Sequence, residues 1–170
     1  MERRHAGNGI LSSGRTLIGI AVPFNTETTV AGRRERVAPG AFSASLASGR
    51  DVLALVNHDA GKLLARTKSG TLRLSERPDG LHYEIDLPDT PQAEDIRGLA
   101  TAGSLGGVSI GFSVAAGGEH ITPDGLRELR RVELIEISVV TAFPAYPGTT
   151  ADLRSQAPRR ARIARYLDTI

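Results

Sequence analysis

Short apolar segments separated by turn signals run through most of this chain, and they restrict it to a fold built mainly from strands. Each segment has the length of a strand rather than of a helix, and most are joined by a few polar residues. In the turn at 77–80, Pro78 presets its own backbone angle and the Asp79-Gly80 pair tolerates a tight bend. Strands are expected at 16–24, 51–58, 63–66, 70–77, 80–87, 107–115 and 131–141.

Helices are fewer. Residues 90–102 are predicted to form one, with Thr90 as its N-cap and Pro91 at the first helical position. A shorter helix is expected within 39–48, and the segments between 63 and 87 are expected to form an antiparallel meander. The predicted fold class is mainly β with a few helices (α+β). A largely antiparallel sheet of this kind can close, or nearly close, into a β-barrel flanked by helices.

The strand expected at 107–115 carries a serine on an unusually bare face. Because alternate residues share a face, the apolar side chains form one core face, while Ser109 lies between Gly107 and Gly111 on the other. A serine on a face without bulky side chains is accessible to a large substrate such as a peptide. The alternative is that the small residues only allow another backbone to approach closely.

His58 lies where an apolar run meets a polar loop, which is a suitable place for a general base. The imidazole there is partly desolvated and still reachable by a substrate. Asn57 or Asp59 could orient the ring. The alternative is a histidine that ends a buried strand with its ring bonded to the backbone.

Glu136 is a carboxylate in the middle of an apolar strand. Such a group is costly there unless it is paired or hydrogen-bonded, and a histidine would be a natural partner. The alternative is an edge-strand glutamate that faces water. Strict alternation places Ile135, Ile137 and Val139 on one face, and Leu134, Glu136, Ser138 and Val140 on the other.

Ser109, His58 and Glu136 are the residue types of a nucleophile, a base and an acid that orients the base. Residue types alone do not show that the three converge. The chain has no cysteine, which excludes disulfides, zinc ribbons and thiol nucleophiles, and its four histidines lack metal-ligand spacing. The sequence also lacks the GxSxG, HExxH, P-loop and GxGxxG motifs. We expect no metal and no cofactor.

A set of ordered motifs points to one family. They are NHD at 57–59, DGL at 79–81, GSLGGVSIGF at 103–112 and LIEISVVTAFPAYPG at 134–148. With this order and spacing, the chain resembles the HK97-type prohead (capsid maturation) protease family of tailed phages. The resemblance covers about residues 16–150.

The resemblance implies a fold similar to the herpesvirus assembly proteases, a mainly antiparallel β-barrel ringed by helices. It also implies a serine endopeptidase with His58 as base and Ser109 as nucleophile, and Glu136 matches the family's acidic third member. The herpesvirus relatives use a second histidine instead. Here the other candidates, His82 and His120, lie outside the matching block.

The resemblance further implies proteolysis in the host cytoplasm, inside the assembling prohead. The implied substrates are the scaffold protein, a scaffold-like N-terminal extension of the major capsid protein, or both, with self-cleavage, and the herpesvirus relatives suggest a homodimer. We divide the chain into a flexible arm (1–15), a protease domain (16–150) and a basic tail (151–170).

The net charge of +2 is unevenly distributed. The tail carries five arginines against two aspartates, while the rest has 16 basic and 17 acidic residues. A basic nucleic-acid-binding domain does not fit this pattern, so nucleic acid is expected only in weak contacts by the tail. Two other functions stay open: a non-catalytic capsid-assembly interaction protein on the same fold, and a nucleic-acid-binding module. No apolar run approaches the roughly 20 residues of a membrane span, and no membrane association is expected.

Overall fold

The computed structural model describes residues 14–30, 32–141 and 152–154. Within them lie twelve strands and two helices, more strands than the seven or eight expected. The helices are α1 (Ser43–Ala47) and α2 (Pro91–Thr101). The strands are β1 (Thr16–Pro23), β2 (Thr28–Val30), β3 (Arg33–Val37), β4 (Leu53–Val56), β5 (Asp59–Arg66), β6 (Leu72–Arg77), β7 (Gly80–Asp86), β8 (Gly107–Val114), β9 (Glu119–Ile121), β10 (Arg127–Leu129), β11 (Val132–Val140) and β12 (Asp152–Arg154).

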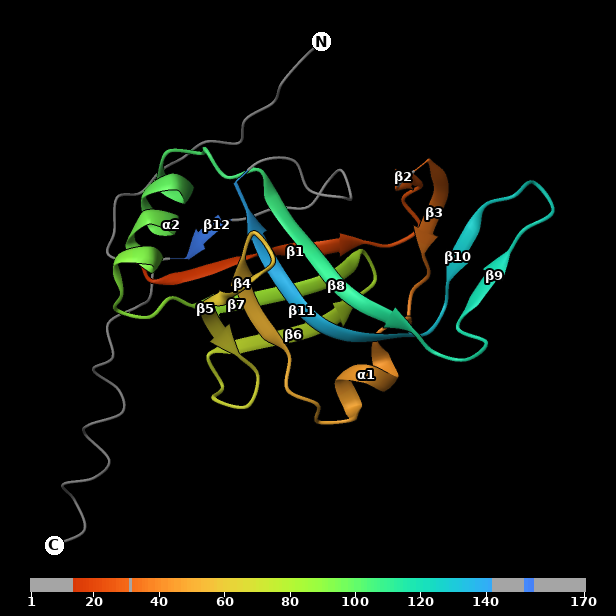
Figure 1. Cartoon of the computed structure of the whole chain (residues 1–170), viewed down its shortest axis with the longest axis horizontal. Coiled ribbons are helices and arrows are strands. Elements are labelled where there is room, and N and C mark those ends of the chain that lie inside the picture. The colour runs from red at the N-terminus through yellow and green to blue at the C-terminus, as the bar shows by residue number, and fades with distance from the viewer. Residues whose placement is uncertain (1–13, 31, 142–151, 155–170) are drawn as a thin grey trace, which may run out of the picture.

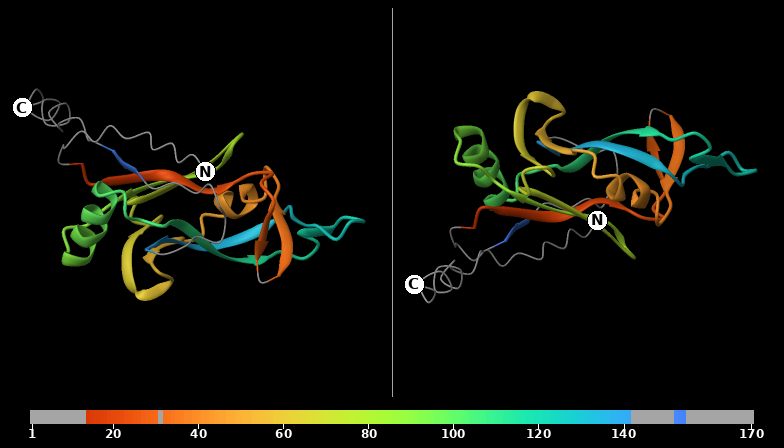
Figure 2. Two further views of the ribbon diagram at one scale, coloured as in Figure 1. Left: turned by 90° about the horizontal axis from the view of Figure 1, so that it is seen from above. Right: turned by 90° about the horizontal axis from the view of Figure 1, so that it is seen from below.

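The strands form three sheets of four strands each. Sheet A has the order β12-β1-β7-β6, sheet B the order β2-β3-β10-β9, and sheet C the order β5-β4-β11-β8. Most pairings are antiparallel, but β4 pairs with β11, and β3 with β10, in parallel. Sheets A and C lie in two layers, and the β9–β10 hairpin of sheet B projects from one end (Figures 1 and 2).

The core fills the space between sheets A and C. Tyr83 of β7 contributes from sheet A, while Ile137 and Val139 of β11 contribute from sheet C, and all three are at most 1% exposed. Phe42, just before α1, closes one end of the core and stacks on Phe24 with ring centroids 6.3 Å apart. One face of sheet C is therefore apolar, which leaves its other face for polar groups.

The expected barrel is not confirmed, because none of the three sheets closes on itself within the described residues. The expected meander between 63 and 87 is wrong in part. β6 and β7 form the predicted hairpin, but β5 pairs with β4 in sheet C and β6 lies in sheet A. The chain changes sheet between Arg66 and Leu72, where Gly70 has a φ of 71° that favours glycine.

A β-bulge in β11 corrects the predicted faces of that strand. Leu134 pairs with Phe112 and Glu136 pairs with Gly111, so Ile135 is an extra residue without a partner. Leu134 is consequently buried with the core, and Ile135 is 47% exposed instead of buried. Strict alternation fails here because the extra residue shifts the period by one.

Sheet B carries a cluster of charged side chains on β3 and β10. Two of its carboxylates, Glu35 and Glu128, are buried. Arg127 bonds Glu35 at 2.7 Å, and both Arg36 and Arg130 bond Glu128. The hydrogen bonds from Arg36 and Arg130 hold the pKa of Glu128 below its usual value. Paired charges thus add to the apolar contacts of these short strands, whose Val37 and Leu129 are buried in the core.

The predicted helix at 90–102 is confirmed as α2, with the Thr90 hydroxyl accepting a hydrogen bond from the Ala93 amide at 3.3 Å. The short helix expected within 39–48 is α1.

The predicted N-terminal arm lies outside the described residues, apart from its last two positions. Of the predicted basic tail, only β12 is described, and it pairs with the start of β1. No helix of the described part has the length and apolarity to cross a membrane.

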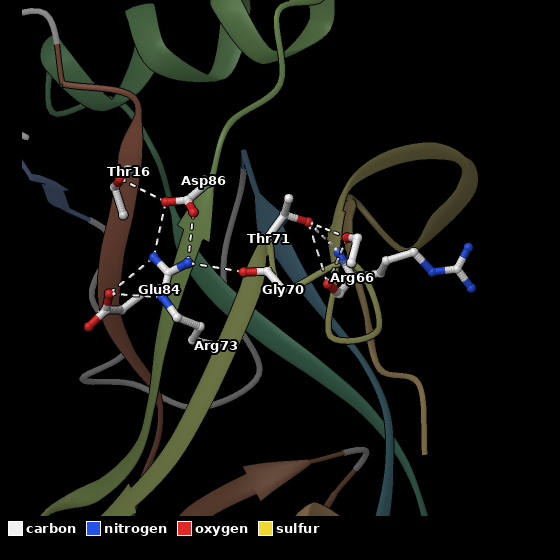
Figure 3. A network of polar contacts seen from close by, with 8 residues as sticks. Thr16, Arg66, Gly70, Thr71, Arg73, Glu84 and Asp86 are labelled. Carbon is white, nitrogen blue, oxygen red and sulfur yellow. Dashed lines mark hydrogen bonds and ion pairs between the residues drawn. The ribbon is translucent and has the colours of Figure 1, made fainter. Parts of the chain in front are cut away.

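A polar network ties the strands of sheet A together on their solvent side (Figure 3). The guanidinium of Arg73 on β6 bonds both carboxylate oxygens of Asp86 on β7, at 2.7 and 3.0 Å, and it also bonds Glu84. Asp86 in turn accepts a hydrogen bond from Thr16 on β1 at 2.9 Å. The Arg73 side chain is 44% exposed, so water and salt weaken this network.

We therefore expect core packing to stabilise the fold more than this network does. Leu134→Ala should lower the free energy of unfolding by about 2–5 kcal/mol, because it leaves a cavity under β11. Arg73→Ala should lower it by less than about 1 kcal/mol, as is usual for exposed ion pairs. Urea unfolding of both variants checks this, and a larger loss in Arg73→Ala would contradict it.

Candidate active site

His58 lies in a two-residue turn between β4 and β5. Val56 and Asp59 pair across the hairpin, and Asn57 and His58 between them have φ values of 51° and 60°. Tight hairpins of this kind require positive φ at both central residues, and asparagine tolerates that conformation better than most residues. The turn therefore presents the His58 side chain at the tip of a hairpin.

Asn57 fixes this turn to the end of β11. Its backbone amide donates to the carbonyl of Val139 at 3.0 Å, which continues the parallel ladder between β4 and β11 by one bond. Its side-chain carbonyl accepts from the Thr141 amide, also at 3.0 Å. The ring of His58 is thereby held beside β11.

His58 and Glu136 are in direct contact. Nδ1 of the ring lies 2.6 Å from Oε1 of the carboxylate, and the Glu136 side chain is only 12% exposed. Its second oxygen, Oε2, accepts a hydrogen bond from the Ser138 hydroxyl at 2.7 Å. The cost of burying this carboxylate in an apolar strand is thus offset by two partners.

The small size of Gly111 provides the space for this carboxylate. Gly111 is the cross-strand partner of Glu136, and a Cβ atom at Gly111 would lie 2.4 Å from Oε1. No side chain larger than hydrogen fits there unless Glu136 moves. The glycine at position 111 on β8 is therefore explained by the close approach of the Glu136 side chain, and not by the approach of another backbone.

Ser109 lies on β8, directly opposite Ser138 of β11. The residue is only 7% exposed, so the face is less open than its small residues predicted. Its hydroxyl forms no hydrogen bond with any of the described residues, including His58. The structure thus brings His58 and Glu136 together and places Ser109 on the neighbouring strand, without a bond between Ser109 and His58.

This arrangement can prepare an imidazole to accept a proton. An ionised Glu136 requires the proton of the neutral ring to be on Nδ1, which leaves the lone pair on Nε2. Within the described part of the chain Nε2 has no hydrogen-bond partner, and the His58 side chain is 46% exposed. A substrate or a nucleophile can therefore reach the basic nitrogen.

The other candidate residues lie elsewhere or have other partners. Asp59 accepts a bond from the Gly61 amide at 2.8 Å within its own strand, so it does not orient His58. His82 is in sheet A, where its contact with Asp79 at 2.8 Å lowers the pKa of that carboxyl. His120 is on β9 of sheet B. Neither histidine shares a sheet with Ser109.

Sequence reasoning missed the contributions of Ser138 and Gly111. Asn57, one of the two residues expected to orient the His58 ring, instead holds the turn through its bonds to Val139 and Thr141. A usable signal existed for Ser138, because it shares a strand face with Glu136 and is too polar for a buried position. For Gly111 the signal was incomplete, because the bulge that aligns it with Glu136 has no mark in the sequence.

The model of the caudovirus prohead serine protease family matches residues 4–162 of the 170 in this chain. The chain belongs to this family. The resemblance drawn from the sequence motifs is thereby confirmed, and the protein is a serine protease with a role in phage capsid maturation. No curated protein and no solved structure matches the chain.

Among the described residues of this prohead protease, no cluster of side chains points to a metal site. Across the described ranges, no group of three or more His, Cys, Asp or Glu side chains could hold a metal ion. A pocket of about 310 Å³ lies between α1 and the start of β11, with Arg50 and Glu133 in its lining. None of the three predicted site residues lines it, so we do not assign it to the site.

The close approach of Gly111 to Glu136 gives a direct test of the site. Gly111→Ala should displace the carboxylate from His58, because the added methyl group occupies its position. We expect the protein's reaction with a fluorophosphonate, a general serine-protease reagent, to slow by about tenfold to a hundredfold, since small misplacements of reacting groups have effects of this size.

The matched control is Gly98→Ala in α2, where an added Cβ meets no atom within 4 Å. This change should leave the reaction rate unchanged and raise stability by about 0.5–1 kcal/mol, as expected for alanine in a helix. Equal rates in wild type and Gly111→Ala would show that the position of Glu136 does not matter for the reaction.

Proposed function

We propose that the protein is an endopeptidase in which Ser109 is the nucleophile, His58 the general base and Glu136 the group that orients His58. The observation that carries this proposal is the 2.6 Å contact between Nδ1 of His58 and Oε1 of Glu136, one strand away from Ser109. A carboxylate on Nδ1 holds a neutral histidine base in the tautomer whose Nε2 lone pair can accept a proton, and it stabilises the imidazolium that then forms.

In the proposed reaction, the Ser109 hydroxyl attacks the carbonyl carbon of the scissile peptide bond while Nε2 of His58 takes its proton. The proton then passes from Nε2 to the leaving amine as the C–N bond breaks, which leaves an acyl ester on Ser109. Water, deprotonated by the same nitrogen, hydrolyses the ester. Hydrogen bonds between nucleophile and base often form only once substrate is bound, which fits the absence of a Ser109–His58 bond here.

We further propose that the substrates are the scaffold protein, the scaffold-like N-terminal extension of the major capsid protein, or both, and that the chain also cleaves itself. Membership of the prohead protease family supports this choice. The position of Ser109 supports a large substrate, because β8 is an edge strand of sheet C within the described residues. An extended peptide can approach an edge strand from outside the sheet.

The test is co-expression of the full chain with the capsid and scaffold proteins of its phage, followed by intact mass measurement. Wild type should yield shortened capsid or scaffold products, and Ser109→Ala and His58→Ala should yield none. Ser113→Ala is the matched control on the same strand, and Ser104→Ala is a second one; both should cleave like wild type.

Two results would contradict the proposal. Cleavage by Ser109→Ala would move the nucleophile to another residue. Assembly of proheads without cleavage by any form would favour the non-catalytic assembly function.

A further inference from the structure

Ser138 is a polar residue at a position that the fold makes completely inaccessible. Its exposed fraction is 0%, and its neighbours Ile137 and Val139 on β11 are buried and apolar. An isolated hydroxyl in such a place is costly unless both its donor and its acceptor functions are used. The partners of this hydroxyl therefore indicate why a serine is there.

The Ser138 hydroxyl has two partners, and both belong to the proposed catalytic pair. It accepts a hydrogen bond from the backbone amide of His58 at 3.0 Å and donates one to Oε2 of Glu136 at 2.7 Å. The directions are fixed, because a backbone N–H can only donate and an ionised carboxylate can only accept.

These bonds complete a closed ring of interactions. It runs from the His58 backbone to the Ser138 hydroxyl, on to the Glu136 carboxylate, and back to the His58 ring through the 2.6 Å contact. The same hydroxyl thus holds the carboxylate by one oxygen and the main chain of the histidine by its amide. The distance between the His58 ring and the Glu136 carboxylate therefore depends on both of these hydrogen bonds.

The amide of His58 also needs this hydroxyl as an acceptor. His58 lies in the turn beyond the last bond of the β4–β11 ladder, and its amide has no backbone partner among the described residues. Its acceptor is the Ser138 hydroxyl. Packing alone would be satisfied by valine or alanine, which offer no acceptor.

We propose that Ser138 is a positioning residue for the His58–Glu136 pair, an inference that rests on the proposed function. Its hydroxyl holds the Glu136 carboxylate in the orientation that keeps the proton on Nδ1 of His58. It acts through these two residues and does not touch the substrate.

The test uses the full-length protein and three variants, Ser138→Ala, Ser138→Thr and Ser138→Val. Threonine and valine have nearly the same shape, and only threonine keeps the hydroxyl. A packing role predicts that valine, the apolar residue, performs at least as well as threonine. A positioning role predicts that threonine retains most of the function and that valine and alanine lose it.

Two readouts are measured on each variant, with the melting temperature as a check of folding. The first is the rate at which a fluorophosphonate modifies Ser109, which should fall about tenfold to a hundredfold in Ser138→Ala and Ser138→Val. The second is the low-field proton NMR signal of the His58 ring N–H, assigned by its loss in His58→Gln because His82 also contacts a carboxylate. This signal should disappear or move upfield in Ser138→Ala and Ser138→Val and persist in Ser138→Thr.

The outcomes separate this inference from the proposed function. A wild-type rate and an unchanged His58 signal in folded Ser138→Ala would overturn the positioning role while leaving Ser109 as nucleophile. Failure of wild-type Ser109 to react would overturn the proposed function, and the NMR signal would still decide the role of Ser138. If Ser138→Thr or Ser138→Val does not fold, the comparison of wild type with Ser138→Ala decides it alone.

Discussion

A carboxylate buried in the middle of an apolar strand is the constraint on which the arrangement around the site depends. The Glu136 side chain is 12% exposed, and its position is possible only because three neighbours accommodate it. Gly111 on β8 leaves the space, Ser138 on β11 donates a hydrogen bond, and His58 in the β4–β5 turn contacts the other oxygen. These residues come from separate segments, so forming the site requires sheet C to be assembled.

Sheet C separates packing from chemistry by using its two faces differently. One face buries Val108, Ile137 and Val139 against sheet A, and the other holds Ser109, Glu136 and Ser138. The bulge in β11 changes the phase of the strand, so that Leu134 stays in the core while Glu136 faces the site. The parallel pairing of β4 with β11 then places the His58 turn at the same location. The site is thus held by the strands of sheet C and by a tight turn bonded to β11, which position side chains more rigidly than free loops do.

The sequence predicts most single elements well, because alternation and turn residues are local signals. The strand of Ser109, the strand of Glu136 and the helix after Thr90 all form as expected. The partners of each strand were less predictable, since the parallel β4–β11 pairing is a long-range contact without a local mark. The exposure of Ile135 and the burial of Glu35 likewise depend on neighbouring strands. A bulge and an ion pair are set by the neighbouring strand and not by the residue's own segment.

The most direct test of the account is to identify the serine that a fluorophosphonate modifies in the full-length protein. After the reaction, the chain is digested and the modified peptide is located by tandem mass spectrometry. The account predicts a single adduct on Ser109, because this serine lies opposite Ser138, on the strand next to the His58–Glu136 pair, and its hydroxyl forms no hydrogen bond with the described part of the chain. An adduct on Ser104 or Ser113, with Ser109 unmodified, would contradict it.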